Sequence, residues 1–254
     1  MLENIHSLNQ MMDVRTGHPL VTVIRPKENL RCDGRCDFHV MVIRGPLPKG
    51  CSDYGLQDCD YRRATVSFYL PGERIDTRRA EHIIAFDNDY FKCVADVQPY
   101  FSYSEKESLH LSERDHRQIN SVVEQMKVEI GHDIDDSTCS LISDIIRLLM
   151  DMCHRFYKYQ FILREHQASQ IVSNVDAILD NYFFAEILAT RTLPDDDYFA
   201  ERIGHTAAYL NDLLKVTTGK TLQELSLLKL ADKSESRQEL EEILVNLQPE
   251  ESNE

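Results

Sequence analysis

The chain has 254 residues, with 28 basic and 43 acidic side chains and a formal net charge of −15 at pH 7. Hydrophobic residues make up 42% and charged residues 28%, which is typical of a globular protein and excludes a disordered or fibrous chain. There is no apolar run of transmembrane length, and the residues after Met1 do not resemble a signal peptide. We therefore expect a cytoplasmic protein that makes no membrane contact.

Charge and cysteine content narrow the possible functions further. The seven cysteines are odd in number and scattered, so we expect reduced thiols and not a disulfide framework. DNA-binding proteins draw much of their affinity from basic residues that neutralise phosphates, which an acidic chain supplies poorly. Any DNA binding must therefore be confined to a local patch of the surface.

Before about residue 104, short apolar runs alternate with turn residues. The runs cover 20–24, 38–43, 64–70 and 82–86, and Pro, Gly or Asp follows each within two residues. Several short strands with few helical repeats predict a small β-barrel or jelly roll.

After residue 110, apolar residues recur at helical spacing. Ser112 and Asp115 form a capping pattern at the start of one helix, and longer helices are predicted over about 138–165 and 169–188. The length and the strong apolar stripe of the 138–165 helix favour packing against a partner helix.

Residues 198–220 contain two short helical patterns separated by Gly204. Asp195–Asp197 can cap the first helix, and Thr206 can cap a second one that runs to about Thr217. Thr221 and Glu224 form a second capping box. Two short helices joined by a glycine-containing turn predict a helix-turn-helix. Its small core would be filled by Ile203, Leu210, Leu213 and Leu214.

This stretch resembles the first helix-turn-helix of the AraC/XylS family of transcription regulators. The matching residues are Ala200, Thr206, Tyr209, Leu210, Lys215 and Thr218-Gly219-Lys220. Phrases farther upstream resemble a Bacteroidetes-type branch of that family, and they lie at 18–21, 70–72, 100–103, 109–113 and 156–162. The resemblance spans roughly residues 5–231.

The resemblance implies an α+β chain in four parts. These are a cupin-like β-barrel sensor (1–104), a helical linker and dimerisation region (105–190), a partial AraC-type helix-turn-helix (191–231) and an acidic tail (232–254). It implies a transcription regulator that senses a small-molecule effector, forms a homodimer through helices in 112–188 and binds double-stranded DNA. Asn211 and Asp212 would reach base edges, and Lys215 and Lys220 would contact phosphates. The implied DNA-binding residues are Thr206, Ala207, Ala208, Asn211, Asp212, Lys215 and Lys220.

The chain also departs from the family pattern. The second helix-turn-helix is missing, because only 34 residues follow Lys220, and none of them is glycine. Nine of these residues are acidic and three are basic, and His205 occupies a position that is usually apolar. An alternative function follows, in which a DNA-binding-deficient sensor or interaction protein modulates related regulators by dimerisation.

Catalytic and metal-binding patterns are weak. The spacing of Cys32, Cys36, Cys51 and Cys59 is not that of a zinc finger or ribbon. His18, His39 and His82 lack the His-x-His arrangement of cupin enzymes, which favours structural roles. The pairs Arg62-Arg63 and Arg78-Arg79 could bind an anionic effector, and solvated strand ends would explain them equally well. We expect no enzyme activity, no metal and no cofactor.

Overall fold

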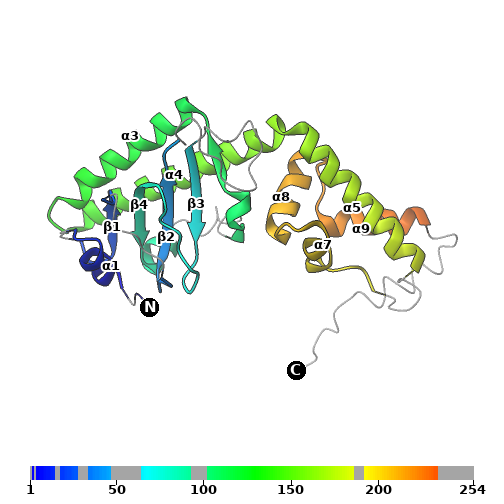
Figure 1. Ribbon diagram of the computed structural model, residues 1–254, viewed down its shortest axis with the longest axis horizontal. Helices are drawn as coiled ribbons and strands as arrows, with labels where there is room; N and C mark the ends of the chain where they lie inside the picture. The colour runs from blue at the N-terminus through cyan, green and yellow to red at the C-terminus, as the bar shows by residue number, and fades with distance from the viewer. Residues whose placement is uncertain are drawn as a thin grey trace, which may run out of the picture. The chain divides into compact units, whose positions relative to one another are not determined.

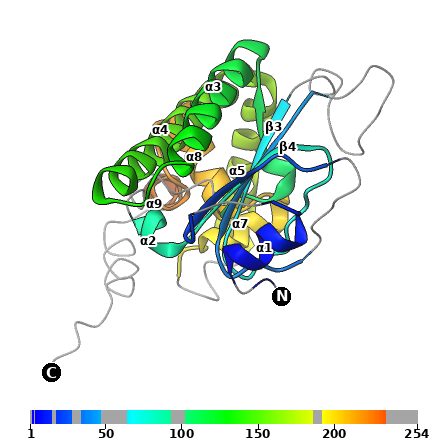
Figure 2. The same cartoon turned by 90° about the vertical axis from the view of Figure 1, so that its left-hand side faces the viewer.

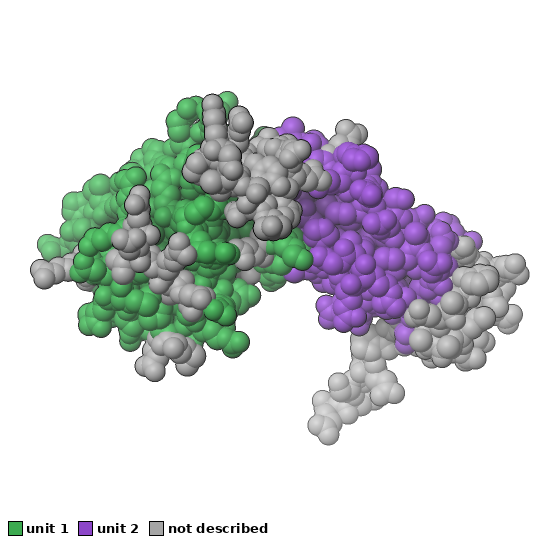
Figure 3. All heavy atoms as spheres, in the orientation of Figure 1, with its two compact units in different colours: residues 1–160 green, residues 161–254 purple. Residues whose placement is uncertain are grey.

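A computed structural model describes residues 2, 4–14, 18–27, 34–46, 64–92, 102–185 and 192–233. The fold is α+β, and the chain divides into two compact units, Met1–Gln160 and Phe161–Glu254 (Figure 3). The division falls within a long helix, so the predicted linker region of 105–190 contributes to both units. It does not coincide with the predicted boundaries after residues 104, 190 and 231.

The described part of the first unit contains an antiparallel sheet of five strands in the order β1-β4-β2-β3-β5 (Figure 1). The strands are β1 (Val21–Ile24), β2 (His39–Arg44), β3 (Ala64–Tyr69), β4 (Ala80–Phe86) and β5 (Leu109–Leu111). The first four match the predicted apolar runs. The three-residue β5 was not predicted, because so short a segment shows no usable periodicity.

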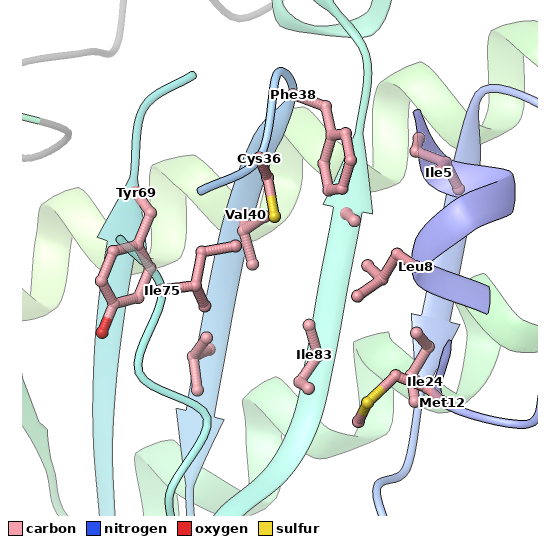
Figure 4. Packing of buried hydrophobic residues seen from close by; sticks show 12 residues of the cluster. Ile5, Leu8, Met12, Ile24, Cys36, Phe38, Val40, Tyr69, Ile75 and Ile83 are labelled. Atoms are coloured by element: carbon pink, nitrogen blue, oxygen red, sulfur yellow. The ribbon is translucent and has the colours of Figure 1, made fainter. Parts of the chain in front are cut away.

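Both faces of this sheet are buried. One face packs against α1 (Ile5–Met11), and Figure 4 shows Ile5 and Leu8 on the same side of the sheet as Ile24 and Ile83. The other face is covered by helices, among them α3 (Glu113–Ile130), which contacts β1 and β5. All six residues of β2 are buried as a result, which explains why its centre, residues 40–43, is an unbroken apolar run.

The cupin-like β-barrel expected for residues 1–104 is not confirmed, because the sheet is open. Within the described residues, β1 pairs only with β4 and β5 pairs only with β3, so these are edge strands. Helices on one face and α1 on the other remove the apolar side chains from water without closure. The apolar runs correctly indicated buried strands, but they did not specify which elements would cover them.

The predicted helices are confirmed with small shifts at their ends. Ser112 caps α3, since its Oγ accepts a hydrogen bond from the Asp115 amide at 3.2 Å. The next two helices are α4 (Asp136–Leu163) and α5 (Glu165–Ala185). Shorter helical segments are α2 (Asn88–Lys92) and the 3₁₀ turn η3 (Glu105–Glu107). In the described part of the chain, no helix combines the length and apolarity needed to cross a bilayer.

The second unit is helical. It contains the end of α4, α5, α7 (Asp196–Ile203), α8 (Ala207–Thr217) and α9 (Leu222–Lys233). α5 contacts α7, α8 and α9, so the short helices share one core with it. The buried residues of that core are Val175, Leu179, Tyr182, Phe183, Phe199, Leu210, Leu214, Leu222 and Leu230.

Candidate nucleic-acid interface

The turn between α7 and α8 has the geometry that the sequence predicted. Asp195 caps α7, with its Oδ1 accepting from the Tyr198 amide at 2.8 Å. Gly204 ends α7 in the left-handed region at φ 79°, where a side chain would be strained, and its amide donates to the Ala200 carbonyl at 2.9 Å. Thr206 then caps α8 through its hydroxyl, which accepts from the Tyr209 amide at 3.3 Å. Two short helices therefore meet at a tight turn, as in a helix-turn-helix.

The core beneath this turn is well filled. The predicted core residues Leu210, Leu213 and Leu214 are buried, and Ile203 is partly buried. The most important addition is Phe199, which is fully buried between the short helices and α5. Phe199 was not among the predicted core residues, although its position four residues before Ile203 places it on the same face of α7.

The candidate DNA-binding residues lie on α8 and in the turns on either side of it. Thr206, Ala207 and Ala208 are half-buried at the start of α8. Asp212 is half-buried one turn later, and Lys215 is exposed in the last turn. Lys220 is half-buried just beyond α8, where its amide donates to the Thr218 hydroxyl at 3.2 Å.

Asn211 differs from its neighbours, because both ends of its side-chain amide are used inside the unit. Its Nδ2 donates to Asp196 Oδ2 at 2.7 Å, and its Oδ1 accepts from the Leu222 amide at 2.9 Å. A backbone donor on one side and a carboxylate on the other fix the orientation of this amide. Gln223 extends the network by donating from Nε2 to Asp196 Oδ1 at 2.9 Å. Asn211 thus joins the starts of α7 and α9 to the middle of α8.

Glu224 partly neutralises the two candidate phosphate-binding lysines. The backbone amide of Thr221 donates to its carboxylate at 2.7 Å and is the main reason that its pKa is lowered. The positive charges of Lys215 and Lys220 make the smallest contributions to the lowering of the same pKa. Glu224 is therefore an ionised carboxylate at neutral pH, and its charge interacts weakly with those of both lysines.

His205, which occupies a position where the resemblance implies an apolar residue, packs against an aromatic ring. Its ring stacks on Tyr209 with centroids 4.9 Å apart and planes 19° apart. Tyr209 in turn meets the Phe161 ring edge-to-face at 5.2 Å. An imidazole can fill this half-buried position because its ring faces are apolar enough to stack.

The other sequence candidates do not converge on a site. Cys32, Cys51 and Cys59 lie outside the described residues, and Cys36 is a buried thiol. Among the described residues, no group of three or more His, Cys, Asp or Glu side chains could hold a metal ion. Of the two arginine pairs, Arg62-Arg63 lies outside the described residues, while Arg78 forms an ion pair with Asp76 at 2.7 Å.

The three candidate histidines are buried and have separate environments. His18 hydrogen-bonds with the Tyr90 hydroxyl at 3.2 Å, and His39 stacks on Phe86. Burial lowers the pKa of both His39 and His82 to about 4, so each is a neutral imidazole at physiological pH. These features agree with the structural roles that the sequence favoured.

Comparisons with protein-family models, curated proteins and solved structures give no match to this chain.

Proposed function

We propose that this protein is a transcription regulator of the AraC/XylS type, which senses a small effector, dimerises and binds double-stranded DNA through α8. The α7–turn–α8 geometry carries the proposal: a capped helix, a left-handed Gly204 and a second capped helix on a shared core. In this arrangement the second helix enters the major groove. Ala207, Ala208 and Asp212 would face the bases, and Lys215 and Lys220 would contact phosphates.

Asn211 has a different task in this proposal. Its amide links Asp196 and the Leu222 backbone, so it holds the recognition helix in place relative to its neighbours. Base reading would then fall to the residues on either side of it. Lys215 is the better test of DNA contact, because it is exposed and its removal disturbs no packing.

The deciding experiment is fluorescence anisotropy with labelled duplexes from the upstream region of the protein's own gene. We expect binding that weakens with salt and that survives nonspecific competitor DNA. Lys215→Ala should weaken binding to all sequences and reduce the salt dependence, because it removes one phosphate contact. Lys106→Ala, an exposed lysine in the first unit, is the matched control and should bind like the wild type. Identical affinity in the Lys215 and Lys106 variants would argue against α8 as the interface.

Dimerisation is supported by an exposed apolar stripe at the start of α4. Leu141 and Leu148 are 48% and 45% exposed, and the half-buried Ile145 lies between them. Steps of three and four residues are the spacing of a coiled-coil seam. Exposed leucines in such a register are costly in water unless a second helix covers them.

The proposed dimer can be tested by sedimentation velocity. The double variant Leu141→Glu, Leu148→Glu should be monomeric at concentrations where the wild type is dimeric. Val128→Glu, which replaces a 61% exposed apolar residue on α3, is the control and should remain dimeric. A wild type that stays monomeric at high concentration would contradict the role of this stripe.

A second candidate is a DNA-binding-deficient partner of related regulators. It is favoured by the position of Glu224 beside Lys215 and Lys220 and by the internal use of Asn211. It predicts a folded dimer that shows no anisotropy change at low salt. It also predicts that the protein lowers the DNA affinity of a full-length relative when the two are mixed.

A further inference from the structure

The first unit contains a cavity of about 430 Å³. Its walls come from β3, from the turn after β3, from the segment before β5 and from Tyr157 of α4. Cavities of this size hold small organic molecules. Its lining combines three tyrosines, three serines and two arginines with Phe68, Gly72 and Glu73.

Arg35 and Arg74 both line this cavity, and they face each other across an isolated antiparallel β-bridge. Directly opposed residues in such a bridge have Cβ atoms roughly 4.5–5.5 Å apart, and like charges there are destabilising. Within the described ranges, no carboxylate forms an ion pair with the Arg35 guanidinium, which is exposed. The nearby Glu73 is occupied in part by the turn, because its Oε2 accepts from the Leu70 amide at 2.7 Å. Two positive groups therefore converge at the cavity.

A third arginine lies behind the cavity wall. The Arg44 side chain is almost fully buried on β2 and donates to Ser67 Oγ at 2.7 Å and to the Tyr69 hydroxyl at 3.0 Å. Asp76 Oδ2 lies 3.9 Å from Arg44 Nη2, and the same oxygen pairs with Arg78 at 2.7 Å. One carboxylate is thus shared between Arg44 and Arg78 behind this wall of the cavity.

The hydroxyls of the wall are oriented by Arg44. A guanidinium only donates, so Ser67 and Tyr69 must accept from it and must direct their own protons elsewhere. Ser67 and Ser108, both of which line the cavity, are 2.7 Å apart. The wall therefore carries hydroxyl groups next to a buried guanidinium, which suits a ligand with hydrogen-bond acceptors.

We propose that this cavity binds a small hydroxylated organic anion, whose carboxylate or phosphate lies between Arg35 and Arg74. The hydroxylated body of the ligand contacts Ser67, Ser104 and the Tyr103 ring. An anion between the two arginines would offset their mutual repulsion and form charge-assisted hydrogen bonds. This cavity would be the effector site of the proposed regulator, so the assignment rests on the sensing role in the proposed function. It does not depend on DNA binding.

The test measures the thermal unfolding midpoint with millimolar glucuronate, glucose 6-phosphate or glucose, at ionic strength matched with sodium chloride. We expect at least one of the two anions to raise the Tm by about 2–4 °C and glucose to have no effect. Whichever anion acts identifies a carboxylate or a phosphate as the preferred head group. The proposal is overturned if neither anion raises the Tm, or if glucose raises it equally.

Arg35→Gln is the sharper test, because the Tm of the ligand-free protein should stay the same or increase while the ligand-induced rise in Tm should disappear. Without ligand its Tm should equal or exceed that of the wild type, since one of two opposed charges is removed. With the active anion, the rise should be lost. Arg74→Gln is the second variant and should also lose the rise, while Arg117→Gln, an exposed arginine on α3, should keep it. A ligand-induced rise that persists in both cavity variants would overturn the site, whatever the outcome of the DNA experiments.

Discussion

Polar side chains are hydrogen-bonded differently in the sheet of the first unit and in helices α7, α8 and α9 of the second. In the sheet, the Nδ1 atoms of His39, His82 and His110 are buried without a hydrogen-bond partner, and one guanidinium, that of Arg44, ties two strands to the 74–79 segment. In the helical unit, the Asn211 amide has partners at both ends. The comparison indicates that the sheet buries some polar nitrogens at a cost to its stability, whereas the polar side chains that join α7, α8 and α9 form a connected local network.

The largest expected effect is from Arg44→Ala. The substitution removes four hydrogen bonds and leaves Ser67, Tyr69 and the carbonyls of Asp76 and Arg78 without that donor. We expect a loss of about 3–5 kcal/mol in the free energy of unfolding of the first unit, measured by urea denaturation with circular dichroism. Arg78→Ala, which removes an exposed arginine, should cost less than about 1 kcal/mol. Equal losses in the two variants would refute the cross-linking role of Arg44.

The next effect is a dependence of stability on pH that is specific to the sheet. In the folded state, burial holds the pKa of His39 and of His82 at about 4, against 6.5 for an ordinary histidine. The unfolded chain therefore binds more protons between these values, so stability is complete above pH 6.5 and falls as the pH drops toward 4. One pKa unit corresponds to about 1.4 kcal/mol, so each histidine can contribute a few kcal/mol at most.

Hydrogen exchange at about pH 7 and pH 5 can locate this loss of stability. The amides of β2 and β4 should lose protection on acidification, while those of α8 should change little. His39→Phe should flatten the pH dependence, since Phe can keep the stacking on Phe86 without a titrating group. The exposed His132→Phe is the control and should leave the pH profile of the wild type unchanged.

A smaller effect is expected from Asn211→Ala. The change removes the acceptor for the Leu222 amide and the donor to Asp196, and it should destabilise the second unit by about 1–3 kcal/mol. Asn211→Asp should not rescue stability, because it places a second carboxylate against Asp196. Lys215→Ala should be neutral in the same unfolding assay, although it weakens DNA binding. A fully stable Asn211→Ala protein that has lost DNA affinity would return Asn211 to the base-reading role predicted from the resemblance.

The smallest effect concerns DNA affinity. Glu224→Gln removes the negative charge beside Lys215 and Lys220, and its side-chain carbonyl can still accept from the Thr221 amide. We expect about a two- to fivefold gain in DNA affinity at low salt, which disappears as salt screens the charges. Glu113→Gln, an exposed acid at the start of α3, is the control and should produce no gain. An unchanged affinity in the Glu224 variant would show that this carboxylate does not weaken the phosphate contacts of Lys215 and Lys220, and it would remove one argument for the DNA-binding-deficient alternative.

Much of the local structure could be predicted because its determinants are close in sequence. Ser112, Asp195, Thr206 and the Thr221–Glu224 pair each satisfy a backbone amide within three residues, so their capping roles follow from short patterns. Gly204 follows the same logic, because a left-handed turn residue is most easily glycine.

The cavity and the roles of Arg44 and Asn211 could not be predicted in this way. Arg44 meets Ser67 and Asp76, which lie 23 and 32 residues away, and Asn211 meets Asp196 at a separation of 15. Arg35 and Arg74 face each other only because a bridge forms between two distant segments. No local pattern specifies such pairs.

The sequence by itself therefore determined the α+β class, four of the strands, the approximate positions of the helices and the capped turn between α7 and α8, since propensity, periodicity and capping act over a few residues. The tertiary structure alone decided that the sheet is open, that Asn211 is tied into a network, and that three arginines gather around one cavity. Those features depend on which distant segments pack together, and packing is set by the burial of the whole apolar surface and not by any single stretch of chain.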